Sequence, residues 1–294
     1  MSQTLNERDH PRTFRDNACV YPVLSRRAGG ISVGVNLNPD KSCTFRCVYC
    51  QVVRDTKRPL QPPRVALPGL SAELRAVLEG LAPGGALWQA AEFAALPPEK
   101  KRVCDIAFSG DGEPTMVAGF AAFVEACVAV KESFRPVYAD AKVVLITNAT
   151  GLDRPEVRHT LEWLDEHNGE VWAKLDVGTP EQFKRINGTS FPFVQVLGNI
   201  WTCARARPTV IQSCFARLNG AGPSEAELTA YVARLKEIVA QGGMLKLVQV
   251  YTVARPPAGP GVASLSDAEV DAIAARVRTE TGLRAEAYHG QVSA

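Results

Sequence analysis

The stretch ISVGVNLNPDKSCTFRCVYC, residues 31–50, joins a short apolar run to three cysteines. Residues 31–37 have the composition of a β-strand, and the Asn-Pro-Asp run at 38–40 is typical of a connector. Cys43, Cys47 and Cys50 follow with C-x3-C-x2-C spacing. We therefore predict a strand followed by a short loop that carries three thiols.

Three thiolates on one loop suit a particular inorganic group. Four cysteines would complete a tetrahedral zinc site, whereas three suit a [4Fe-4S] cluster with one iron left open to bind a substrate or cofactor. A zinc-binding structural or interaction protein is the competing interpretation. Against it, the four histidines, at positions 10, 159, 167 and 289, lie away from the loop in the sequence.

Composition narrows the class of protein. A chain of 294 residues with 46% hydrophobic content can bury the core of one large domain. A net charge of +2 gives no field that argues for nucleic acid or membrane, so any RNA contact must be a local patch. The N-terminus lacks the apolar stretch of a signal peptide, and no segment holds eighteen uninterrupted apolar residues. We expect a cytoplasmic protein.

The eight cysteines are not expected to form disulfides in a reducing compartment. Cys104, Cys127, Cys203 and Cys214 have apolar neighbours and are interpreted as small buried side chains. The role of Cys19 stays open.

From residue 31 onward, short apolar runs alternate with segments of helical periodicity, which predicts repeated βα units around a parallel sheet. The expected strands are 31–37, 103–109, 142–147, 171–177, 210–215, 245–252 and 284–288. The expected helices are 72–81, 119–132, 155–167, 180–186, 194–204, 224–240 and 266–281. Residues 57–69 and 255–261 are expected to be loops. Periodicity alone does not choose between a TIM-type barrel and a doubly wound sheet.

The cysteine spacing, with Tyr49 directly before the last cysteine, resembles the cluster loop of the radical S-adenosylmethionine (SAM) enzymes. The resemblance implies an α/β fold, a partial TIM-type (β/α)6 barrel with short N-terminal and C-terminal extensions. We expect residues 1–30 to be an N-terminal extension and residues 31–294 to be the barrel domain with its C-terminal extension. It also implies one [4Fe-4S] cluster on Cys43, Cys47 and Cys50, with SAM bound at the open iron.

A glycine-rich turn with an acidic tip follows the second expected strand of the barrel, at residues 109–115. By itself it is an ordinary turn, because Gly and Asp supply positive φ at low cost. Gly112, Glu113 and Pro114 resemble the Gly-Gly-Glu segment that binds the SAM amino group in the family. Asp111 stands where many members have glycine.

Polar residues near the ends of later strands complete the candidate site. Thr147 and Asn148 form either an Asx turn or a polar site at the top of the barrel. Lys174 and Asp176 share one face of a strand, so Lys174 is either a Schiff-base catalyst or the partner of Asp176 in a structural pair. Tyr251 is a core aromatic or, with Gln249, lines the barrel mouth. The cofactor-binding candidates are Tyr49, Gly112, Glu113, Pro114, Thr147, Asn148, Asp176, Gln249 and Tyr251.

A narrower resemblance rests on residues 25–36, 50–51 and 250–256, which look like bacterial relatives of the wyosine-synthase-like radical SAM group. Archaeal wyosine synthases carry a second cluster on further N-terminal cysteines and modify a guanine in tRNA. Only Cys19 precedes the motif here. Modification of a tRNA base is therefore kept as an alternative, and the reaction class stays open among oxidoreductase, transferase and lyase.

The resemblance implies that a flavodoxin- or ferredoxin-like donor supplies an electron. SAM is then cleaved to a 5′-deoxyadenosyl radical, which abstracts hydrogen from an unidentified substrate. Basic residues near the loop either solvate a surface or steer an acidic donor or anionic substrate. They are Arg12, Arg15, Arg26, Arg27, Arg54, Lys57, Arg58 and Arg64.

Overall fold

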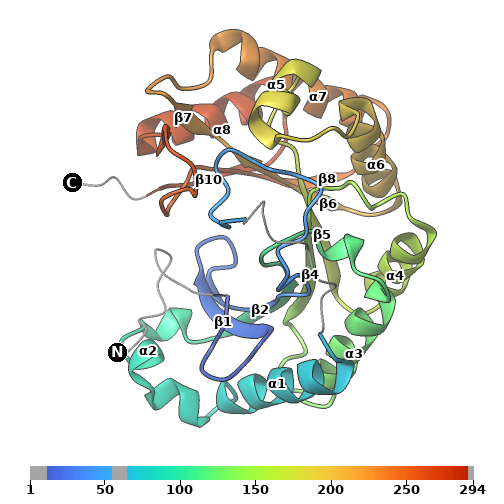
Figure 1. Cartoon of the computed structure of the whole chain (residues 1–294), viewed down its shortest axis with the longest axis vertical. Coiled ribbons are helices and arrows are strands. Elements are labelled where there is room, and N and C mark those ends of the chain that lie inside the picture. The colour runs from blue at the N-terminus through green and yellow to red at the C-terminus, as the bar shows by residue number, and fades with distance from the viewer. Residues whose placement is uncertain (1–11, 55–64, 291–294) are drawn as a thin grey trace. The chain divides into compact units, whose positions relative to one another are not determined.

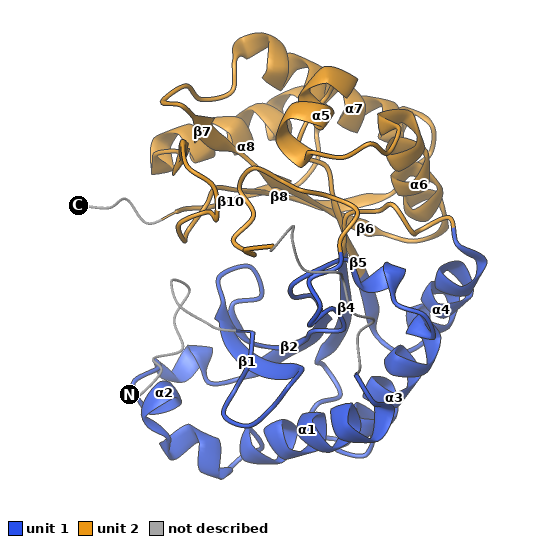
Figure 2. Ribbon diagram, viewed as in Figure 1, with its two compact units in different colours: residues 1–42, 58–146, 154–170 blue, residues 43–57, 147–153, 171–294 orange. Residues whose placement is uncertain are grey.

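The computed structural model describes residues 12–54 and 65–290 (Figure 1). It divides the chain into two compact units (Figure 2). Unit 1 comprises residues 1–42, 58–146 and 154–170, and unit 2 comprises residues 43–57, 147–153 and 171–294. The cysteine loop therefore belongs to unit 2, whereas the glycine-rich turn belongs to unit 1.

Unit 1 is built on four strands that neighbour one another in chain order. They are β1 (Val20–Ser25), β2 (Gly30–Val35), β3 (Val103–Phe108) and β4 (Lys142–Thr147), whose last residue lies in unit 2. β1 pairs antiparallel with β2, and the other pairs are parallel. The helices are α1 (Leu67–Gly80), α2 (Ala91–Ala94), α3 (Phe120–Glu132) and α4 (Pro155–Asp165), with 3-10 turns at Ala86–Gln89, Pro98–Lys100 and Pro114–Met116.

Unit 2 also orders its main strands along the chain, and they pair in parallel. They are β5 (Gly169–Lys174, whose first two residues lie in unit 1), β6 (Thr209–Cys214), β8 (Leu245–Tyr251) and β10 (Ala285–Tyr288). β7 (Ala216–Leu218) and β9 (Val262–Ser264) form a separate antiparallel ribbon. The helices are α5 (Pro180–Asn187), α6 (Phe193–Ala206), α7 (Glu225–Ala240) and α8 (Asp267–Thr281).

The strand order decides between the two α/β architectures that periodicity left open. A doubly wound sheet reverses its strand order at a switch point, and neither unit contains such a reversal among its described strands. Both β2 and β6 are buried along their whole length, as expected of parallel strands covered on both faces. The chain has the predicted α/β fold, a partial TIM-type barrel.

Helices α5, α7 and α8 of unit 2 each begin with a capping box. Ser224 and Ser266 each accept a side-chain hydrogen bond from the backbone N–H of a glutamate three residues later, and that glutamate's carboxylate accepts a hydrogen bond from the backbone N–H of the serine. The same capping box, formed by Thr179 and Gln182, begins α5. No described helix has the length and apolar content needed to cross a bilayer.

Several expectations need correction. The helix expected at 72–81 begins at Leu67, because Pro68 is well suited to a first helical turn. β1, β7 and β9 were not predicted; β7 and β9 are three residues long, too short to show an alternating pattern. Cys104 is half-buried rather than buried, because it stands near the start of β3, whose first two residues are not enclosed.

Cys19 is packed against a carboxylate in unit 1. Glu73 accepts hydrogen bonds from the backbone N–H groups of Ala18, Cys19 and Val20 at 2.9–3.0 Å, and from the Cys19 thiol at 3.2 Å. Burial, with the hydrogen bond to Glu73, raises the pKa of the Cys19 thiol far above its usual range. The residue is therefore a protonated packing group, which gives the open question of its role a structural answer.

Candidate functional site

The loop that carries Cys43, Cys47 and Cys50 is fixed by backbone bonds within unit 2. Cys50 N–H donates to the carbonyl of Cys47, which closes a tight turn between two of the thiols, and Ala258 N–H donates to the carbonyl of Cys50 at 2.8 Å. Phe45 is buried with its ring edge-on to Phe183, at 5.2 Å between centroids. The three thiols themselves are half-buried. The loop is thus anchored by backbone bonds and aromatic packing.

Each of the three sulfur atoms receives a hydrogen bond from a different side-chain nitrogen. Asn148 Nδ2 lies 3.7 Å from Cys43 Sγ, Asn187 Nδ2 lies 3.5 Å from Cys47 Sγ, and an Arg54 Nη atom lies 3.3 Å from Cys50 Sγ. A thiolate carries negative charge and accepts hydrogen bonds, so thiolate ligands are expected to have N–H donors directed at their sulfurs, as all three sulfurs have here. The donor set fits an iron–sulfur cluster.

The three sulfurs do not converge on one point. Across residues 12–54 and 65–290, no group of three or more His, Cys, Asp or Glu side chains is gathered closely enough to hold a metal ion. A [4Fe-4S] cluster does not require that convergence, because its irons are ligated by separate thiolates. Burial raises the pKa of the Cys47 thiol to about 12, so ligation of iron there must displace a proton.

Thr147 and Asn148 form the predicted Asx turn, and Asn148 also bonds to the cysteine loop. Asn148 Oδ1 accepts from the backbone and hydroxyl of Thr150, which makes an Asx turn, while its Nδ2 donates to Thr44 at 2.8 Å as well as to Cys43. Thr147 accepts from the N–H of Ala149, a residue with a positive φ of 68°. This strained turn holds the first cysteine of the loop.

The C-terminus of α5 supports the middle of the loop through a residue that the sequence did not single out. Asn187 and Ile186 accept backbone bonds from Arg46 and Val48 at 2.9 Å, on either side of Cys47. The Asn187 side chain is 1% exposed and donates to Asp176 at 2.7 Å. In the sequence, Asn187-Gly188 indicates only the end of a helix, because Gly188 is a C-cap residue in the left-handed conformation.

Lys174 and Asp176 lie together as predicted for two residues on one face of a strand. Lys174 Nζ is 3.4 Å from Asp176 Oδ1 and donates to the Tyr251 hydroxyl at 2.6 Å. Its ammonium also lies 5.1 Å from the ring centroids of both Tyr49 and Tyr251. The Tyr49 hydroxyl donates a short hydrogen bond to Asp176. A buried cation is therefore enclosed by two aromatic rings and one carboxylate.

The charge of Asp176 determines the protonation state of Lys174. Burial alone would lower the pKa of Lys174, but the neighbouring carboxylate of Asp176 outweighs it and holds the pKa above its usual range. Burial, followed by the charge of Asp176, raises the pKa of Tyr49. Lys174 is thus kept protonated, which favours the structural pair over a Schiff base. The buried side chain of Gln249 accepts a hydrogen bond from that of Gln212 at 2.8 Å.

The glycine-rich turn of unit 1 is tightly constrained. A Cβ on Gly112 would lie 1.9 Å from the carbonyl oxygen of Ser42, so only glycine fits there. Glu113 is 2% exposed; its N–H donates to Ser42 at 3.1 Å, and its carboxylate accepts from the Thr115 hydroxyl at 2.7 Å. Pro114 then opens a 3-10 turn. The turn is thus bonded to the residue directly before Cys43.

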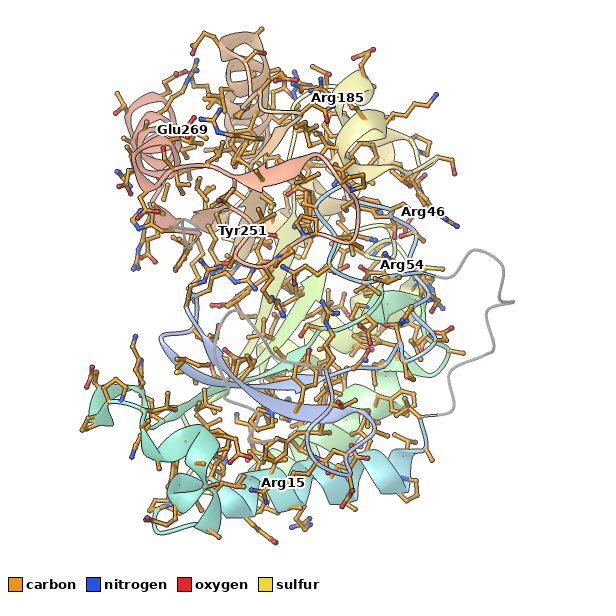
Figure 3. The ribbon with its side chains drawn as sticks, turned by 60° about the vertical axis from the view of Figure 1, so that its left-hand side comes forward. Arg15, Arg46, Arg54, Arg185, Tyr251 and Glu269 are labelled. Atoms are coloured by element: carbon orange, nitrogen blue, oxygen red, sulfur yellow. The ribbon has the colours of Figure 1, made fainter. Side chains whose placement is uncertain are left out.

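Asp111, which departs from the family pattern, has structural partners in unit 1. Its carboxylate accepts from Arg12 and from Asn36 Nδ2, both at 2.7 Å. One of the predicted basic residues is therefore neutralised there. Lys57, Arg58 and Arg64 lie outside the described residues, and Arg15 packs over the ring of Phe14 (Figure 3).

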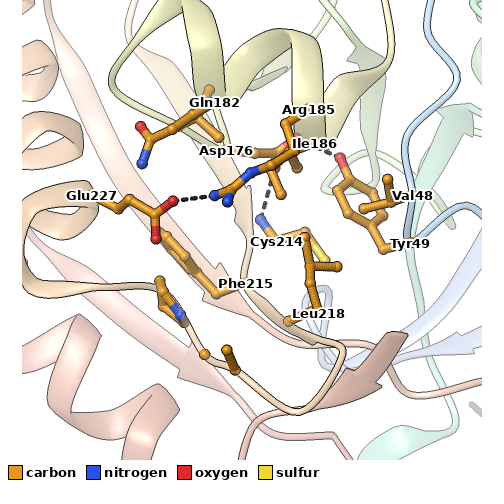
Figure 4. Close-up of a pocket in the computed structure, with 15 residues that line it drawn as sticks. Val48, Tyr49, Asp176, Gln182, Arg185, Ile186, Cys214, Phe215, Leu218 and Glu227 are labelled. Carbon is orange, nitrogen blue, oxygen red and sulfur yellow. Dashed lines mark hydrogen bonds and ion pairs between the residues drawn. The ribbon is translucent and has the colours of Figure 1, made fainter. Parts of the chain in front are cut away.

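A cavity of about 110 Å³ opens in unit 2 beside Tyr49 and Asp176 (Figure 4). One wall consists of apolar side chains, among them Val48, Ile186 and Phe215. At another, Arg185 reaches Glu227 in an ion pair, and both Asp176 oxygens are engaged by Tyr49 and the Cys214 N–H. Because its polar groups are already paired, the cavity suits a flat, largely apolar group.

Comparison with known proteins shows the fold. No protein-family model matches the chain. It has a TM-score of 0.57 and 13% identity with a radical SAM methyltransferase from Sphaerobacter thermophilus, covering 92% of this chain and 69% of that one. Archaeal TYW1 gives a TM-score of 0.45 at 12% identity, covering 92% and 86%. The first likeness confirms the radical SAM resemblance at the level of the fold.

The chain also has sequence similarity to a curated protein. It is named GTPase Obg, from Brachyspira hyodysenteriae, and is 26% identical over 185 residues. The match covers 62% of this chain but only 22% of that protein. The chain therefore corresponds to a small part of that relative.

Proposed function

We propose that the protein is a radical SAM enzyme with one [4Fe-4S] cluster on Cys43, Cys47 and Cys50, which cleaves SAM reductively and abstracts hydrogen from a substrate. The observation that carries this proposal is the loop of three cysteines, each with its own N–H donor, on a fold shared with a radical SAM methyltransferase. Once bound, the cluster would supply the electron that converts SAM to methionine and a 5′-deoxyadenosyl radical.

The chain's own residues position and shield this chemistry. Asn148 and Asn187 donate hydrogen bonds to the sulfurs of Cys43 and Cys47, and the backbone turn from Cys47 to Cys50 fixes the position of Cys50. Lys174 is assigned a positioning role: its charge holds Asp176, which in turn orients the Tyr49 hydroxyl next to the last cysteine. A protonated lysine is a poor nucleophile, and this supports positioning over covalent catalysis.

For SAM we assign two contacts. The adenine ring is assigned to the cavity beside Tyr49, because one wall of that cavity is apolar and the polar groups of the other are already paired. Glu113 meets the ammonium group, as the resemblance implies; its burial beside the Gly112 turn supports a prepared carboxylate. An external donor of the flavodoxin or ferredoxin class supplies the electron to the cluster. The substrate is not identified.

The test is metal content after anaerobic reconstitution with iron and sulfide. We expect about four irons and four sulfides per chain, and loss of both in Cys43→Ser, Cys47→Ser and Cys50→Ser. Cys104→Ser is the matched control, because Cys104 is also half-buried but lies in unit 1. One zinc per chain, with no sulfide bound, would contradict the proposal and favour a zinc-binding module.

A further inference from the structure

Three side-chain nitrogens donate to the cysteine sulfurs, and of these only the Arg54 guanidinium carries a charge. This guanidinium lies 3.3 Å from Cys50 Sγ and is close enough to interact electrostatically with Cys43 and Cys47 as well. Asn148 and Asn187 are neutral amides that each approach one sulfur, at 3.7 and 3.5 Å. Among these side-chain donors one is cationic and two are neutral, while the backbone N–H groups of Phe45 and Val52 also donate to Cys43 Sγ and Cys50 Sγ, at 3.4 and 3.5 Å.

The side chain of Arg54 is half-buried, so water and salt screen its charge only in part. Reduction of a thiolate-bound cluster adds one negative charge at the sulfurs and irons. A positive charge and N–H groups directed at the sulfurs stabilise that added charge, and hydrogen bonds to sulfur are a known determinant of cluster potential.

Arg46 offers a natural comparison on the same loop. It stands between Cys43 and Cys47 but is exposed, so solvent screens its charge more than that of the half-buried Arg54. Figure 3 marks both arginines. Both residues are arginines on the cysteine loop, but Arg54 contacts a sulfur atom and Arg46 is exposed. Comparing them separates the effect of a direct contact with sulfur from the effect of a surface charge.

We propose that Arg54 is a positioning residue that raises the reduction potential of the cluster through Cys50, with Asn148 and Asn187 adding smaller contributions through Cys43 and Cys47. The inference rests on the proposed function. It assigns to Arg54 the task of bringing the cluster within reach of an external one-electron donor. Loss of its charge and N–H groups together disfavours reduction most, and loss of the charge alone disfavours it less.

The experiment is a redox titration of the reconstituted full chain, with dithionite as the electron source and electron paramagnetic resonance of the reduced cluster as the readout. Iron and sulfide content confirms loading of each variant. We expect Arg54→Met to lower the equilibrium constant of reduction about tenfold, a shift of about 59 mV to more negative potential for a one-electron couple. Arg54→Gln keeps N–H donors without charge, and Arg54→Lys keeps charge without the planar fork; both should shift less.

Arg46→Met should leave the potential at the wild-type value. A loaded Arg54→Met protein with the wild-type potential would overturn the inference, and so would an equal shift in Arg46→Met. If Arg54→Met loads poorly, Arg54→Gln decides the question, because an unchanged potential there excludes a role for the charge. A wild-type chain that takes up no iron and sulfide overturns both the proposed function and this inference, whereas an unshifted potential overturns the inference alone.

Discussion

The side-chain amide of Asn187 donates a 2.7 Å hydrogen bond to the carboxylate of Asp176. This bond joins the end of α5 to the residues that follow β5, and the same amide lies 3.5 Å from the sulfur of Cys47. Asn187 Oδ1 is buried without a hydrogen-bond partner in the described part of the chain. A buried acceptor left unpaired is costly, and the bonds that the Asn187 amide donates to Asp176 and Cys47 offset that cost.

Replacing Asn187 should therefore release the cysteine loop. We expect Asn187→Ala to lower the free energy of unfolding by about 2 kcal/mol, because the buried carboxylate of Asp176 and the thiol of Cys47 lose a donor. The loaded variant should also release iron to a chelator faster than the wild type. Gln195→Ala is the control: Gln195 also donates to a carboxylate, that of Asp153, but the pair is exposed, and the change should stay within about 0.5 kcal/mol. Equal effects in the two variants would contradict the assigned role.

The fold was predictable because it depends on local patterns. Alternating apolar runs and helical segments mark the parallel strands and their helices, and the helices expected at 224–240 and 266–281 lie within a residue of α7 and α8. The cysteine spacing located the loop. Asn187 and Arg54 could not be assigned from the sequence, because their roles depend on contacts made after folding: Asn187 lies 140 residues from Cys47.

Lys174 should not form a Schiff base at neutral pH. The charge of Asp176 keeps its pKa high, so the amine stays protonated. With glyoxylate and cyanoborohydride, peptide mass mapping should show modification of the exposed Lys184 and none of Lys174. Modification of Lys174 at a rate above that of Lys184 would contradict a positioning role and restore the catalytic one.

Asp105 should make stability depend on pH. Burial raises the pKa of this carboxyl to about 6, opposed by the short hydrogen bond from Ser32. Because the folded-state pKa lies above the unfolded one, the group favours folding at low pH, and this stability is lost as pH rises from about 4 to about 6. Between pH 5 and pH 7 the loss is about 1.3 kcal/mol.

Asp105→Asn removes the titrating group and keeps an acceptor for Ser32. Denaturant unfolding at pH 5 and pH 7 should show that this variant gains about 1.3 kcal/mol over the wild type on going to the higher pH. The exposed Asp140→Asn serves as control. A difference between Asp105→Asn and wild type that does not vary with pH would show that Asp105 is charged at both values.

Filling the cavity beside Tyr49 should impair SAM binding. Ala221 lines the cavity and is exposed, so a tryptophan at this position can extend into the space without disturbing the core. We expect Ala221→Trp to weaken binding of S-adenosylhomocysteine to the loaded protein at least about tenfold by calorimetry. Ala240→Trp, at the exposed end of α7, should bind as the wild type does. Unchanged affinity in Ala221→Trp would place the adenosyl group elsewhere.

The most direct test of the central claim is formation of 5′-deoxyadenosine by the reconstituted chain with SAM and dithionite under anaerobic conditions. The account predicts that the wild type and Cys104→Ser both form 5′-deoxyadenosine and methionine in equal amounts. Cys50→Ser should form neither, because one of the three thiolates is missing. A fully loaded wild-type protein that produces no 5′-deoxyadenosine would contradict the assignment of SAM cleavage to Cys43, Cys47 and Cys50.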